Sequence, residues 1–154
     1  MSLEIGRITN AMESCDFIER MLEDLPRWRP KAKYMIARAV AKCIIKTLGD
    51  LVREVYYVDL SGGEATIDFT GRDVDIIVLV DERLRGLEPD LKVALEYSLN
   101  ALVARYAGIY IAETGKKDIV EIHVVTDKNS GYGRLLTSRY YKSIKLHPEP
   151  PPLM

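Results

Sequence analysis

Residues 73–81, with the sequence DVDIIVLVD, restrict the fold of this chain more than any other segment. After the first three residues, both sets of alternate positions are mainly Val, Ile or Leu. Successive side chains of a β-strand point to opposite faces of its sheet, so a strand that is apolar at both sets of positions is buried on both faces. The segment therefore predicts a central strand of a sheet that helices cover on both sides.

Two helical patterns precede the first predicted strand. In residues 2–25 the apolar side chains recur at intervals of three and four, which predicts one helix of about six turns. Pro26 ends this pattern, and Pro30 stands where a first-turn proline begins a second helix. Gly49 is the expected C-terminal cap of that helix. Residues 2–48 therefore predict a helical hairpin whose apolar stripes must pack on a larger body.

The remainder of the chain alternates between strand and helix patterns. Around the central strand, the further predicted elements are strands at 52–60, 65–70 and 119–126, a long helix from Pro89, and a helix or strand that extends to Leu146. Together they predict an α/β (α+β) fold with a central mixed sheet of about four to five strands, on which the N-terminal hairpin and the long helix pack. We expect a single domain over 1–146, with its sheet-containing part at 52–146, and an extended proline-rich tail at 147–154.

Composition excludes several classes of protein. The chain has 154 residues, of which 47% are hydrophobic and 29% charged, so it can build a core and is unlike a disordered chain. A formal net charge of −1 predicts no overall attraction to nucleic acid or to anionic membranes, and the longest apolar runs are too short to span a bilayer. No basic and apolar leader opens the sequence, so we expect a cytoplasmic protein. The chain has no Gln and three Asn, a depletion described for heat-adapted proteins.

The two cysteines, Cys15 and Cys43, lie one in each of the predicted N-terminal helices. Their spacing is not that of a metal site, and both fall within apolar helical patterns. Cysteines of this kind are typical of buried free thiols, so the sequence predicts two thiols in a reducing compartment.

Asp73 and Asp75 stand at the start of the buried strand. Alternation places both side chains on one face, about 7 Å apart along the chain. Two such carboxylates repel each other unless a cation lies between them, and Mg²⁺ binds proteins through one or two carboxylates. The alternative is that both residues lie at the exposed mouth of the strand, where Asp is common.

Two further features accompany this pair of aspartates. Gly62 and Gly63 predict a turn whose backbone N–H groups can approach a phosphate, although two glycines between strands also form ordinary hairpin turns. Glu121 is the only carboxylate of the strand IVEIHVVT, where its burial costs free energy unless it is paired, bound to a metal or at a sheet edge. His123 lies two residues after Glu121 and therefore on the same face of the strand. It is a candidate metal ligand or proton carrier, and the alternative is a residue that only packs there.

The glycine turn, the Asp-x-Asp strand, the helix and the later carboxylate strand together resemble the nucleotidyltransferase superfamily, which is typified by DNA polymerase beta and the minimal nucleotidyltransferases. The resemblance covers residues 60–145. It implies transfer of a nucleotidyl group from an NTP to a hydroxyl acceptor, assisted by Mg²⁺ or Mn²⁺. The catalytic residues and metal ligands that it implies are Asp73, Asp75 and Glu121. The residues that it implies for binding the triphosphate are Gly62, Gly63 and Arg72.

Several departures from the family pattern support other functions. Gly63 stands where the family has a serine, Glu121 stands where it has Asp, and 64–70 has a strand pattern where the family has a helix start. A second hypothesis is therefore an inactive relative that binds a nucleotide, nucleic acid or a protein partner through the same cleft. A third is a metal-dependent nuclease that uses Asp75 and residues 81–83, although these bracket one strand about 20 Å long.

A basic stripe lies on the second predicted helix. Residues 27–46 contain seven Lys and Arg and no acidic residue. Such a stripe can contact the phosphates of nucleic acid, or it can be the solvated face of an amphipathic helix. The apolar stripes of the hairpin would also suit a homo-oligomer.

Overall fold

The computed structural model describes residues 5–12, 15–26, 29–58, 73–107, 118–129, 131–137 and 143–148. The helices, in chain order, are α1 (Ile5–Met12), α2 (Phe17–Leu22), α3 (Arg29–Leu48) and α4 (Glu88–Tyr106). The strands are β1 (Val52–Val58), β2 (Val74–Val80), β3 (Val120–Val125) and β4 (Ser143–His147). Three 3₁₀ segments join them, η1 (Gly49–Leu51), η2 (Glu82–Leu84) and η3 (Gly131–Thr137). Within this part of the chain, no helix has the length and apolar character needed to cross a membrane.

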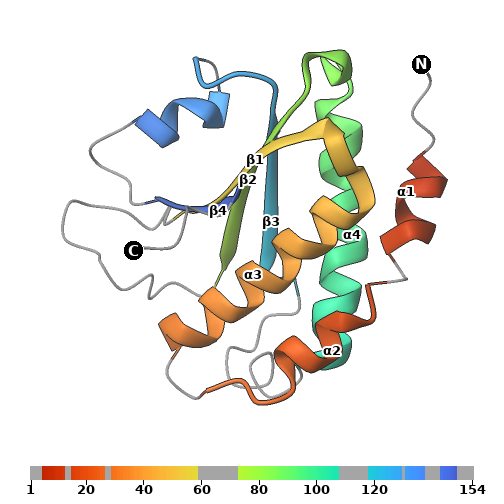
Figure 1. The fold of residues 1–154 in the computed structure, drawn as a ribbon, viewed down its shortest axis with the longest axis vertical. Coiled ribbons are helices and arrows are strands. Elements are labelled where there is room, and N and C mark those ends of the chain that lie inside the picture. The colour runs from red at the N-terminus through yellow and green to blue at the C-terminus, as the bar shows by residue number, and fades with distance from the viewer. Residues whose placement is uncertain are drawn as a thin grey trace.

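The four strands form one mixed sheet with the order β3-β2-β1-β4 (Figure 1). β1 pairs antiparallel with β2 and with β4, whereas β2 pairs parallel with β3. A parallel pair needs a crossover connection, and α4 supplies it. The predicted α+β fold with a central mixed sheet is confirmed. The strand predicted at 65–70 lies outside the described residues.

The two faces of the sheet are covered differently. On one face, alternate residues of β2 such as Ile76 and Val78 join the apolar core under the four helices. On the other face, Ile77 and Leu79 pack with residues of η3. All seven residues of β2 are buried, as the apolar pattern predicts. The prediction that helices cover both faces is right for the face that packs under the four helices. In the described part of the chain, the 3₁₀ segment η3 covers the other face (Figure 1).

The N-terminal hairpin differs from the prediction in its first half. The single six-turn helix predicted over 2–25 is wrong, because α1 ends at Met12 and α2 begins at Phe17. The apolar stripe nevertheless stays buried in both helices. The second helix is confirmed, since α3 ends at Leu48 and Gly49 follows with a φ of 58°, a conformation that favours glycine.

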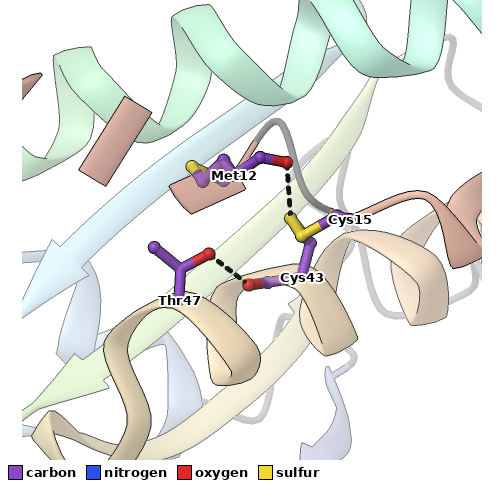
Figure 2. Close-up of a disulfide and its surroundings, with 4 residues drawn as sticks. All are labelled: Met12, Cys15, Cys43 and Thr47. Carbon is purple, nitrogen blue, oxygen red and sulfur yellow. Dashed lines mark hydrogen bonds between the residues drawn. A yellow bond between two sulfur atoms is a disulfide. The ribbon is translucent and has the colours of Figure 1, made fainter. Parts of the chain in front are cut away.

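A disulfide joins Cys15, which lies between α1 and α2, to Cys43 of α3 (Figure 2). The prediction of two free thiols is therefore wrong. The two Cα atoms are 5.6 Å apart, and both side chains are fully buried. The cysteines meet because the apolar stripes that contain them pack against each other. Such contact depends on how the helices pack, and the spacing of the cysteines in the sequence does not reveal it.

Polar side chains of α4 complete the hydrogen bonds of β3, the edge strand beside β2. Asn100 accepts a hydrogen bond from the Val120 N–H and donates one to the Val120 carbonyl, both at 2.9 Å. Glu96, one turn before Asn100, accepts a hydrogen bond from the Ile122 N–H at 3.2 Å. Lys92, two turns before Asn100, donates one to the Ile122 carbonyl at 2.9 Å. These contacts satisfy backbone groups that an edge strand otherwise leaves open.

We expect Asn100→Leu to lower the free energy of unfolding by about 2 kcal/mol, because it strips a buried N–H and a buried carbonyl of their partner. Urea unfolding followed by circular dichroism measures this change. Val93→Ala, at an exposed position of the same helix, is the matched control and should change the value by less than about 0.5 kcal/mol. Equal effects of the two substitutions would contradict the role given to Asn100.

Candidate metal centre

Three side chains with metal-ligating atoms meet on the face of the sheet that η3 covers. Asp75 lies on β2 and pairs in register with Glu121 on β3, while His123 lies two residues further along β3. The residues next to them, such as Ile76 and Ile122, point to the face that the helices cover. Because side chains of a strand alternate, Asp75, Glu121 and His123 point to the opposite face. One ligand atom from each side chain lies within 4.8 Å of the other two. The group could therefore share a single ion.

Two atoms of this cluster are buried without a hydrogen-bond partner. Asp75 and His123 are each 7% exposed. The Asp75 Oδ1 and His123 Nε2 atoms are 3.9 Å apart, and neither is hydrogen-bonded to any described residue. Buried polar atoms in native proteins nearly always have partners, so such atoms require an explanation. A cation bound between the carboxylates and the imidazole would satisfy them, and these oxygen and nitrogen donors fit a divalent metal.

The electrostatics of the cluster also favour a cation. The contact with the Asp75 carboxyl, burial, and the negative charges of Asp75 and Asp73 together raise the pKa of Glu121 above its ordinary value of 4.5. The neighbouring His123 acts in the opposite direction, but less strongly. Ionisation of both carboxylates is therefore unfavourable in the metal-free site, because the two negative charges repel each other. A divalent cation bound between them would offset this repulsion.

Tyr132 of η3 fixes the imidazole of His123. The two rings are stacked, with centroids 3.8 Å apart and an interplanar angle of 21°. The neighbouring Gly133 lets η3 lie against the backbone of Asp127, because a Cβ there would lie 2.3 Å from the Asp127 carbonyl oxygen. Groups around a metal ligand commonly orient it in this way. In the sequence, Tyr132 has no pattern that points to this role.

The structure sorts the residues predicted for the site into three groups. It brings Asp75 and Glu121 together and adds His123, for which the sequence left a metal ligand as one of three roles. Asp73 is not a member of the three-residue cluster, although its charge acts on Glu121. Gly62, Gly63 and Arg72 lie outside the described residues.

The nuclease arrangement is not supported by the position of Asp81. This residue follows the far end of β2, seven residues long, whereas Asp75 lies near its beginning. Its carboxylate accepts hydrogen bonds from the backbone N–H and the side chain of Arg83, both at 2.9 Å. Asp81 therefore caps η2 and does not share a site with Asp75.

We expect Glu121→Gln to raise the stability of the metal-free protein by about 0.5–1 kcal/mol, because it removes one of two like charges on paired positions. The gain should be absent below the ordinary pKa of Glu, where the carboxyl is protonated in both folded and unfolded states. It should grow as the pH rises through the raised pKa of Glu121, because the wild-type protein loses stability over that range.

Thermal unfolding of the two proteins in EDTA, from pH 4 to pH 8, measures this gain. Glu19→Gln, at an exposed position of α2, is the control and should have no comparable effect. A variant at Glu121 that is less stable than the wild-type protein at every pH would show that the carboxylate is structural.

Comparison with protein-family models, curated proteins and solved structures found no match for this chain.

Proposed function

We propose that this chain is a metal-dependent nucleotidyltransferase-like protein, which transfers a nucleotidyl group from an NTP to a hydroxyl acceptor. The observation that carries the proposal is the convergence of Asp75 and Glu121 on paired positions of two parallel strands. These residues were singled out from the sequence as members of one metal site, and the resemblance to the nucleotidyltransferase superfamily gives the same pair a common role.

Mg²⁺ or Mn²⁺ is the proposed cofactor. Asp75 and Glu121 offer the oxygen ligands that both ions take, while the His123 nitrogen suits softer divalent metals and therefore favours Mn²⁺ over Mg²⁺. When bound, the ion would supply Lewis acidity toward phosphate oxygens. Asp75 and Glu121 would hold it, Tyr132 would orient His123, and the nearby charge of Asp73 would strengthen the attraction for cations.

The second candidate function is a binding module of the same fold without catalysis. The observation that favours it is the burial of the site, since Asp75 and His123 are each 7% exposed and Tyr132 stacks on the imidazole. A triphosphate needs room beside the metal. In this alternative the metal would be structural, and the partner would be a nucleotide, a nucleic acid or a protein.

Thermal unfolding with Mg²⁺, Mn²⁺ or Zn²⁺, with and without each NTP, tests the proposal together with an assay of pyrophosphate release. A ligand that binds only the folded protein raises its melting temperature. We expect Mn²⁺ to raise it, an NTP to raise it further in the presence of the metal, and pyrophosphate to be released when an acceptor is supplied from total cellular RNA or protein. A metal effect without turnover, with or without a nucleotide effect, would favour the binding module. No effect of any metal would refute both functions.

The cytoplasm of a heat-adapted organism is the proposed compartment. Cytoplasmic proteins rarely contain disulfides, except in hyperthermophiles, whose intracellular proteins are rich in them. The Cys15–Cys43 bond and the depletion of Gln and Asn are together consistent with that exception. A melting temperature of the oxidised protein within the mesophilic range, about 45–65 °C, would contradict this proposal.

A further inference from the structure

A cavity of about 970 Å³ opens between α2, α3 and β4, the strand at the opposite edge of the sheet from β3. Its inner surface is mainly apolar, with Phe17 and Met21 from α2, Ile45 from α3 and Leu146 from β4. These four side chains are half-buried and pack against the main core. A volume of this size and an apolar lining are typical of sites for small molecules.

The charged residues at this cavity are all cationic. Arg20 of α2 and Arg38, Lys42 and Lys46 of α3 line it with exposed side chains, and no described carboxylate does so. Arg38 and Lys42 are one turn apart on α3 and share a face. The structure gives Arg20, Arg38 and Lys42 no ion pair with a residue that it describes. The cavity therefore combines an apolar interior with positive charges that can accept an anion.

The aromatic rings of the cavity are already in contact with these cations. The guanidinium of Arg38 lies 5.9 Å from the centroid of Tyr34, and the Lys46 ammonium lies 5.6 Å from that of Phe17. Nucleic acids bind basic surfaces by stacking bases on aromatic faces, and here cations lie over those faces. In both pairs a positive charge lies directly beside an apolar surface. This combination suits a ligand that has an anionic head and an apolar body.

We propose that the cavity binds a small anionic amphiphile, with a carboxylate or phosphate head beside Arg38 and Lys42 and an apolar chain over Met21 and Ile45. This site is separate from the metal cluster, because it lies on the helical side and at the other edge of the sheet. Arg38, Lys42 and Lys46, the part of the basic stripe that lines the cavity, thereby acquire a role that the metal site does not give them.

Isothermal titration with dodecanoate, below its micelle concentration, tests the proposal on the full chain. We expect one molecule to bind per chain, and dodecyltrimethylammonium, with the same chain length and the opposite charge, to bind at least about 10-fold more weakly. Lys42→Ala and Arg38→Ala should each weaken dodecanoate binding about 10-fold, since each removes a charge-assisted contact. Lys31→Ala, an exposed cation of α3 outside the cavity lining, should leave the affinity unchanged.

A second variant tests the apolar part of the cavity. Ile45→Glu places a carboxylate among the apolar side chains and should abolish dodecanoate binding, with circular dichroism confirming that the variant folds. Equal binding of the two amphiphiles, or unchanged affinity in the Arg38 and Lys42 variants, would overturn the proposal. Displacement of dodecanoate by a single-stranded oligonucleotide at lower concentration would overturn it in favour of nucleic acid.

Discussion

Replacement of Cys15 and Cys43 by alanine should lower the melting temperature by roughly 7–14 °C, the largest stability change that we expect in this protein. The bond joins residues that are 28 positions apart in the sequence. Closing a loop of that length removes conformational entropy from the unfolded chain, which corresponds to about 3.5 kcal/mol in the chain-entropy account. The bond also joins the segment between α1 and α2 to α3, so its loss should loosen the packing of the first helices on the core (Figure 2).

Differential scanning calorimetry of the wild-type protein, with and without dithiothreitol, separates the bond from the change in side-chain volume. Reduction should lower the melting temperature of the wild-type protein by nearly as much as the double substitution does. The reductant should not affect the variant, in which no thiol remains because the chain has two cysteines. Equal melting temperatures of the oxidised and reduced wild-type protein would show that the disulfide contributes nothing to stability.

Asp75→Asn should eliminate metal binding and lower any nucleotidyl transfer by more than about 100-fold. The substitution keeps the shape of the side chain but removes the charge that is buried beside Glu121 and His123. Changes to residues that only support a metal ligand commonly cost 10–100-fold in affinity or activity, so the loss of a central ligand should cost more. The metal-free variant should remain folded, because the like-charge contact with Glu121 disappears.

Asp81→Asn is the matched control, since Asp81 follows the other end of the same strand and contacts Arg83 instead. Asn caps helices about as well as Asp, so this variant should keep its cap on η2 and the full response to Mn²⁺. Calorimetric titration of Mn²⁺ into the two variants measures the difference. If the Asp75 variant bound Mn²⁺ as tightly as the wild-type protein, the metal site would lie elsewhere. If it bound no metal while turnover persisted, the activity would not depend on this site.

The sequence by itself determined the local elements and the unusual residues within them. A short run that is apolar at both sets of alternate positions defined β2, and the periodicity of three and four defined α3. Pro89 and Gly49 marked where helices begin and end. Such signals are local, because side-chain direction and backbone preference depend on a few neighbouring residues. Glu121 was also identifiable, since a carboxylate in an apolar strand needs a compensating partner.

Only the tertiary structure decided which of these residues meet. The parallel register of β2 and β3 sets Asp75 beside Glu121, and η3 brings Tyr132 onto His123. The segment between α1 and α2 packs on α3 and so pairs the cysteines, while α2, α3 and β4 together form the cationic cavity. These contacts join segments that are distant in the chain, so they depend on strand register and helix packing. A local pattern shows which face of an element is buried, but it does not show which other element buries it.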